Sequence, residues 1–234
     1  MRSTEPLQTL KIDEFIKELN PIFNVKAVIS NTPDTQVWSI TTDIEAAQSV
    51  NSTFLETVLG FPRNIIRWFA LVRLWTPWLA PRQGQLSLDL DKDALLCSFL
   101  RSDGLNFILL AVSGIDDVRT LFQNDNNGCI TISARNDSPR KGVARIIAAV
   151  GKEFELANAA AIYHAREIVR EYGGMSEELS KEVKSLIEND VKTEWMENWY
   201  DGLSYCTWNG LGQKLTETKI LEALESLERN NVKS

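Results

Sequence analysis

Residues 199–212, W-Y-D-G-L-S-Y-C-T-W-N-G-L-G, decide the fold expected for the C-terminal part of the chain. Leu203 to Trp208 form a β-rich run that ends at Asn209-Gly210, a pair typical of turns. A helix is predicted next, because Thr216 can cap it and apolar residues recur at helical spacing from Ile220 to Leu227. The segment is therefore predicted to be one strand–loop–helix unit, of the kind that builds parallel sheets and barrels.

This stretch resembles the start of the catalytic barrel in the raffinose synthase and alkaline α-galactosidase group of glycoside hydrolase family 36. That group carries a first strand of the type D-G-L-G-W-C-T-W-D-A and then a helix of the type T-P-E-x-I-x-x-G-L-x-S-L. Here Asn209 replaces a frequent aspartate, and Tyr205 a frequent tryptophan. More loosely, L-V-R-L-W-T-P-W-L at residues 71–79 is similar to the group's basic and tryptophan-containing segment in its N-terminal β domain. The matching residues of the barrel segment are Asp201, Gly202, Leu203, Cys206, Thr207, Trp208, Thr216, Ile220, Leu224, Ser226 and Leu227.

Composition narrows the class of protein. The chain has 234 residues, an apolar share of 44% and a net charge of −7, which disfavours binding to nucleic acid or to an anionic membrane surface. The first residues lack a secretory apolar segment and no window is apolar enough to span a membrane, so a cytoplasmic protein is expected. The three widely spaced cysteines argue against a disulfide framework and against a zinc site.

Short β-like runs separated by turn clusters dominate residues 23–137, and this pattern predicts an antiparallel β-sandwich. The runs are Val25–Ile29, Gln36–Thr41, Ile65–Leu74, Ala94–Leu100, Asn106–Val112 and Cys129–Ala134.

Helices are predicted after Ser138-Pro139, a capping serine before a first-turn proline. One apolar face runs from Val143 to Phe154, an alanine-rich helix follows over residues 157–171, and a short helix is expected over residues 176–188. The expected organisation is a multidomain α and β protein. It comprises an N-terminal β-sandwich at 1–137, a helical connector at 138–198, and the first β-α unit of an incomplete (β/α)8 barrel at 199–234.

The candidate sugar-binding residues are three tryptophans and one asparagine, and none is acidic. Retaining glycoside hydrolysis needs two carboxylates about 5–5.5 Å apart, and the resemblance implies that these lie on later barrel strands, to which no position of this chain corresponds. Trp208 ends the expected strand, where it either stacks on a sugar or packs in a core. Asn209 either hydrogen-bonds a sugar hydroxyl or turns the chain. Trp75 and Trp78 either line the rim of a sugar pocket or belong to the sandwich core.

The resemblance implies the N-terminal portion of an α-galactosidase or raffinose-synthase-like glycoside hydrolase. The full-length protein would act on α-galactosyl oligosaccharides by a retaining mechanism without cofactor or metal, and this chain alone would be inactive, with self-association through its incomplete barrel. Two alternatives stay open. One is a non-catalytic carbohydrate-binding or assembly module, and the other is a truncated gene model.

Overall fold

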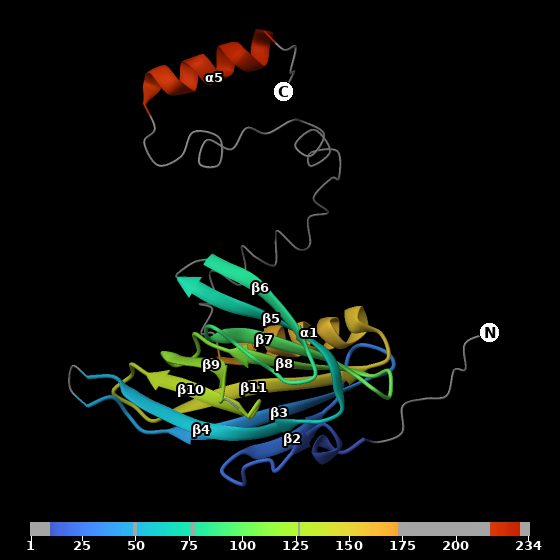
Figure 1. Cartoon of the computed structure of the whole chain (residues 1–234). Helices are drawn as coiled ribbons and strands as arrows, with labels where there is room; N and C mark the ends of the chain where they lie inside the picture. The colour runs from blue at the N-terminus through green and yellow to red at the C-terminus, as the bar shows by residue number, and fades with distance from the viewer. Residues whose placement is uncertain (1–9, 49–50, 76–77, 126, 173–215, 230–234) are drawn as a thin grey trace, which may run out of the picture. The chain divides into compact units, whose positions relative to one another are not determined.

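The computed structural model describes residues 10–48, 51–75, 78–125, 127–172 and 216–229 (Figure 1). The chain divides into two compact units, Met1–Gly174 and Met175–Ser234. The described part of the first unit consists mainly of β-strands with one long helix. The described part of the second unit is helix α5 (Glu217–Arg229).

The first unit begins with a short 3-10 helix, η1 (Ile12–Glu14), and ends with helix α1 (Phe154–Tyr172). Between these helices the described residues form the strands β1 (Ile16–Lys17), β2 (Asn24–Val28), β3 (Thr35–Ile44), β4 (Thr53–Pro62), β5 (Ile65–Trp75), β6 (Trp78–Gln85), β7 (Ala94–Arg101), β8 (Asn106–Val112), β9 (Val118–Asn124), β10 (Ile130–Asn136) and β11 (Gly142–Gly151).

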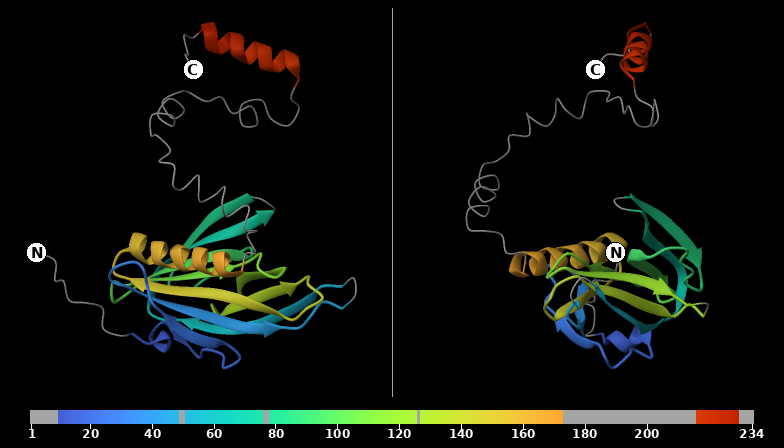
Figure 2. Two further views of the ribbon diagram at one scale, coloured as in Figure 1. Left: turned by 180° about the vertical axis from the view of Figure 1, so that it is seen from behind. Right: turned by 90° about the vertical axis from the view of Figure 1, so that its left-hand side faces the viewer.

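These strands form one 11-stranded sheet with antiparallel pairing throughout. Its main path is β1-β4-β10-β9-β7-β8-β11-β3-β2, and the β5–β6 hairpin branches from it because β5 also pairs with β7. The sheet curls strongly, and the β5–β6 hairpin projects away from its body (Figures 1 and 2).

The curled sheet has a core on each face. Five phenylalanines fill the larger core together with Trp38 and Trp68, and Phe107 lies within stacking distance of two others, with ring centroids 5.1 and 6.1 Å away. On the other face, α1 covers β11, β8 and β3 (Figure 2), and its Ala157, Ala160 and Ala161 are buried against Ile108 and Ile147. The five phenylalanines are Phe15, Phe23, Phe99, Phe107 and Phe122.

The helix expected from Val143 to Phe154 is wrong, because residues 142–151 form strand β11 in the middle of the sheet. Ile146, Ala148 and Val150 face the larger core, whereas Ile147 and Ala149 face α1. A strand covered on both faces reads as a continuous apolar run, in which the alternation typical of a half-exposed strand is lost. β11 lies beyond residue 137, the last residue of the expected sandwich domain.

The predicted fold class is also wrong. The expected antiparallel β-sandwich, helical connector and first β-α unit of a (β/α)8 barrel are replaced by one curled antiparallel sheet with α1 on one face. No parallel strand–helix unit of a TIM barrel occurs among the residues that the structure describes. All six predicted β runs are strands, with shifted ends at most of them. A sandwich was expected because many short strands suggest two sheets, but curling lets one sheet enclose its own core.

The alanine-rich helix predicted over residues 157–171 is confirmed as part of α1. The C-terminal helix is also confirmed as α5, where Glu217 lies in the first turn and the Thr216 hydroxyl accepts a hydrogen bond from the Lys219 amide at 3.4 Å. The strand predicted at 203–208 and the helix predicted at 176–188 lie outside the described residues. Neither described α-helix is long and apolar enough to cross a membrane.

Candidate functional site

The tip of the β5–β6 hairpin carries the two tryptophans that the sequence singled out. Trp75 ends β5 and Trp78 begins β6, and their side chains are 64% and 47% exposed. Their ring centroids lie 6.2 Å apart with an angle of 41° between the ring planes. Leu74 and Leu79 beside them are also exposed. The structure therefore places Trp75 and Trp78 outside the core, as an exposed aromatic pair.

The strand register explains why both indoles share one face of the hairpin. Trp75 pairs directly with Trp78, and a register shift between Arg73 and Trp75 inserts one extra residue on β5. Directly paired residues of antiparallel strands point to the same side, and side chains alternate along each strand. Trp78 therefore shares its face of β6 with Ala80, Arg82 and Gly84.

A groove of about 520 Å³ lies at the other end of β6. Its floor includes Trp68, which is only 6% exposed and which donates a hydrogen bond from its indole Nε1 to the Ser87 carbonyl at 2.7 Å. Gly84 faces this indole, and a Cβ atom at Gly84 would lie 2.5 Å from the Trp68 ring. The glycine thus lets the indole lie flat against β6. The lining includes Trp68, Arg82, Gly84, Ser87, Asp89 and Asp91.

Arg82 and Asp91 form a planar ion pair at the wall of this groove. Nε of Arg82 donates to Oδ1 of Asp91 at 2.8 Å, and Nη2 donates to Oδ2 at 2.9 Å. These hydrogen bonds lower the pKa of Asp91 and raise the pKa of Arg82. Both groups thus stay charged near neutral pH. The pair presents N–H donors and carboxylate acceptors in one plane, a suitable match for neighbouring hydroxyl groups of a ligand.

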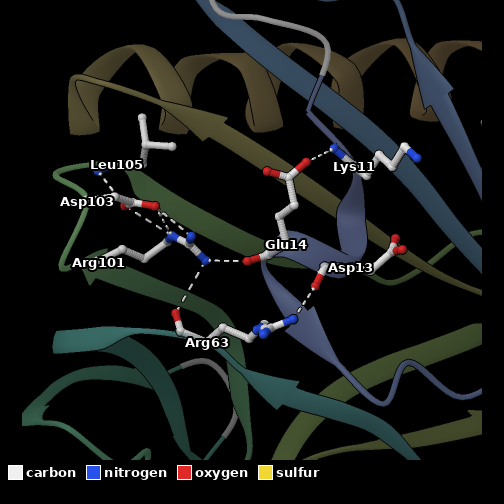
Figure 3. Close-up of polar contacts among 7 residues, drawn as sticks. All are labelled: Lys11, Asp13, Glu14, Arg63, Arg101, Asp103 and Leu105. Carbon is white, nitrogen blue, oxygen red and sulfur yellow. Dashed lines mark hydrogen bonds and ion pairs between the residues drawn. The ribbon is translucent and has the colours of Figure 1, made fainter.

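The most buried arginine of the described residues has a structural role instead (Figure 3). Arg101 is 5% exposed, its guanidinium lies 4.4 Å from the ring centroid of Phe15, and it donates to the carboxylate of Asp103 at 2.6 Å. It also donates to the carbonyls of Glu14 and Arg63 at 2.7 and 3.3 Å. Its hydrogen bonds therefore fix η1 to the sheet, which leaves this cluster a poor candidate for ligand binding.

The remaining candidates do not form a catalytic arrangement within the described part of the chain. His164 lies on α1 with its Nδ1 3.2 Å from Oε2 of Glu167, and no cluster of metal-binding side chains occurs in the ranges that the structure describes. Cys97 and Cys129 are buried free thiols, and burial raises the pKa of both. Trp208 and Asn209 lie outside the described residues.

The sequence indicated the tip of the hairpin but missed the groove. Trp68, Arg82 and Asp91 were not singled out, because they are separated by up to 23 positions. Pairing of β5 with β6 brings Trp68 beside β6, and the chain after β6 folds back to place Asp91 against Arg82. One local signal was present. In W-L-A-P-R-Q-G-Q, residues 78–85, proline and glycine interrupt a strand pattern, which is typical of an edge strand approached closely by another group.

The fold and this hairpin define a β-sheet domain with an exposed aromatic pair and with a polar groove lined by β5, β6 and the segment after β6. Comparisons with protein-family models, with curated proteins and with solved structures find no match to the chain.

Proposed function

We propose that the sheet domain is a non-catalytic carbohydrate-binding domain for α-galactosyl oligosaccharides. The observation that carries this proposal is the exposed pair of Trp75 and Trp78 on the hairpin face that leads to the groove. An exposed apolar group of this kind is typical of an interaction site. Indole faces suit the flat C–H patches of sugar rings, and the Arg82–Asp91 pair suits the hydroxyl groups of a carbohydrate.

The sugar class rests on the resemblance of residues 199–212, and more loosely of residues 71–79, to the raffinose synthase and alkaline α-galactosidase group. The proposal assigns no catalytic carboxylates, cofactor or metal to this chain. Retaining hydrolysis or transfer of galactose stays a prediction for a longer protein. The net charge of −7 supports a neutral ligand over nucleic acid, and the buried thiols of Cys97 and Cys129 suit the reducing cytoplasm.

Calorimetric titration of the 234-residue chain with stachyose, a soluble α-galactosyl oligosaccharide, tests the proposal. The Trp75→Ala/Trp78→Ala double variant is expected to bind at least about tenfold more weakly, equal to about 1.4 kcal/mol, because it removes the stacking surface. Phe54→Ala is the matched control, since Phe54 is an equally exposed aromatic side chain on β4, outside the hairpin. Unchanged affinity in the tryptophan double variant contradicts the proposal.

A second candidate is an assembly module, and the apolar character of the hairpin tip favours it. Leu74, Trp75, Trp78 and Leu79 are all exposed there. If the chain self-associates through these residues, the natural chain should have a higher molar mass in light scattering than the tryptophan double variant. Sugar should not change either mass. An unchanged mass together with lost sugar binding supports the carbohydrate-binding function.

A further inference from the structure

We infer that the tip of the hairpin and the groove beside Trp68 are two subsites of one extended site, so that different rings of one bound oligosaccharide contact the tryptophan pair and the groove. This inference rests on the proposed carbohydrate-binding function. It adds a second subsite and assigns a ligand-binding role to Arg82, Asp91 and the neighbouring wall of the groove.

The two subsites lie on the same face of β6, with the half-buried Ala80 between them. Trp78, Ala80, Arg82 and Gly84 alternate with residues that point to the opposite side. Trp78 and Arg82 are four residues apart, which corresponds to about 13 Å along a strand. A single pyranose ring is much shorter than this separation. A ligand that contacts both the aromatic pair and the ion pair must therefore contain several linked rings.

The chemistry changes along this face from apolar to polar. The tip offers the two indoles, whereas the groove offers the Arg82–Asp91 pair and the exposed carboxylate of Asp89. Gln83 and Gln85 add amide groups at the same strand. Stacking surfaces hold sugar rings in many orientations, and well-placed polar groups fix their orientation. The arrangement thus suits a terminal ring at the tip and further rings in the groove.

The edge of β6 favours a small ligand over a peptide strand. β6 pairs only with β5 among the described strands, so within the described part of the chain its outer edge has no partner strand. Pro81 lies in the middle of this edge and has no backbone N–H, which interrupts the donor pattern that an added strand would need. Side chains, rather than backbone pairing, are therefore expected to hold the ligand.

The test compares a single-ring ligand, methyl α-galactoside, with the tetrasaccharide stachyose on the 234-residue chain. We expect stachyose to bind about tenfold more tightly. Arg82→Gln is expected to remove this advantage and to leave the affinity for methyl α-galactoside unchanged. Arg140→Gln is the matched control, because it removes the same charge from an exposed arginine in the β10–β11 turn. Circular dichroism melting checks that each variant is folded.

Nuclear magnetic resonance of the indole N–H groups locates each ligand independently of affinity. The chain has 7 tryptophans, and the signals of Trp68, Trp75 and Trp78 are assigned from single substitutions. We expect methyl α-galactoside to shift the signals of Trp75 and Trp78. Stachyose is expected to shift the signal of Trp68 as well, since the Nε1–H of Trp68 lies at the floor of the groove.

The outcomes separate this inference from the proposed function. Equal affinities for the two ligands, with no effect of Arg82→Gln, overturn the extended site and leave the binding domain intact. Equal weakening of both ligands by Arg82→Gln also overturns it, because the residue then belongs to one compact site. Absence of binding for both ligands overturns the inference together with the proposed function.

Discussion

Strands β11 and β6 belong to the same sheet but differ in how deeply their residues are buried. β11 pairs with β3 and β8, and its residues are buried or half-buried along its whole length. β6 pairs only with β5 among the described strands, and its residues alternate between exposed and half-buried. Burial on both faces provides most of the stabilisation that a strand can give, whereas the exposed strand keeps side chains available for a ligand.

The largest expected effect concerns the contribution of the buried strand β11 to the free energy of unfolding. Ile147→Ala on β11 is expected to lower the free energy of unfolding by about 2–5 kcal/mol, because it leaves a cavity between the sheet and α1. Leu79→Ala on β6 is the control and is expected to change it by less than about 0.5 kcal/mol, since Leu79 is exposed. Urea unfolding measures both. Equal costs would show that the hairpin tip is part of the core.

A smaller effect is expected where the exposed hairpin meets the core. Gly84→Ala places a Cβ atom 2.5 Å from the Trp68 ring, so the indole or the strand must move. Such overpacking typically costs about 1–3 kcal/mol. We expect this loss in thermal unfolding, with a changed near-ultraviolet circular dichroism signal from the displaced indole. Gln83→Ala, at the neighbouring exposed position, should leave both measurements unchanged.

Strand β11 shows how far the sequence could predict the fold. Short β-like runs bounded by turn residues, such as Ala94–Leu100 and Asn106–Val112, were predicted correctly as strands. β11 reads G-V-A-R-I-I-A-A-V-G, and its apolar residues also fit a helical face, so a helix was predicted there. Only the position of the strand between two cores distinguishes the two structures. That position depends on pairing with Thr35–Ile44, about a hundred residues earlier.

The candidate site was predictable only where it is local in the sequence. Trp75 and Trp78 lie three positions apart, so their segment could be recognised as one candidate. Arg82 and Asp91 approach each other because the chain folds back after β6, and Trp68 joins them through its pairing with Gly84. No residue type marks these three in the sequence. The exposure of Trp75 and Trp78 could not be predicted either, because a tryptophan in a strand pattern fits a core as well as a surface.

Two of the carboxylates paired with arginine, Asp103 and Asp91, should differ modestly in their effect on stability in acid. Hydrogen bonds from Arg101 lower the pKa of Asp103. Its contribution to folding is therefore complete above the unfolded pKa of about 3.9 and is lost as the pH falls through the lower folded value. Asp103 is 41% exposed, so solvent screening limits the loss in Asp103→Asn to about 1 kcal/mol at neutral pH.

Asp91→Asn provides the comparison, because Arg82 also lowers the pKa of Asp91 but the pair lies at the surface. We expect the stability of Asp103→Asn to converge on that of the natural chain as the pH falls below the lowered pKa of Asp103 in the folded protein. Asp91→Asn is expected to shift the pH profile less than Asp103→Asn does. Chemical unfolding at a series of pH values measures both. A larger shift for Asp91→Asn would show that the hairpin pair, rather than the Arg101 cluster, is structurally important.

The smallest expected effect on stability belongs to Trp75→Ala. Trp75 is 64% exposed, so its removal should change the free energy of unfolding by less than about 0.5 kcal/mol. Trp68→Ala, seven positions earlier on the same strand, is the contrasting variant and should cost about 3–5 kcal/mol, since Trp68 is buried in the core. Urea unfolding measures the two variants, and titration with stachyose measures the binding of Trp75→Ala. We expect intact stability and weakened binding for Trp75→Ala, because the exposed indole of Trp75 contributes to the ligand site and little to the core. A large loss of stability in Trp75→Ala would instead assign the aromatic pair to the packing of the hairpin.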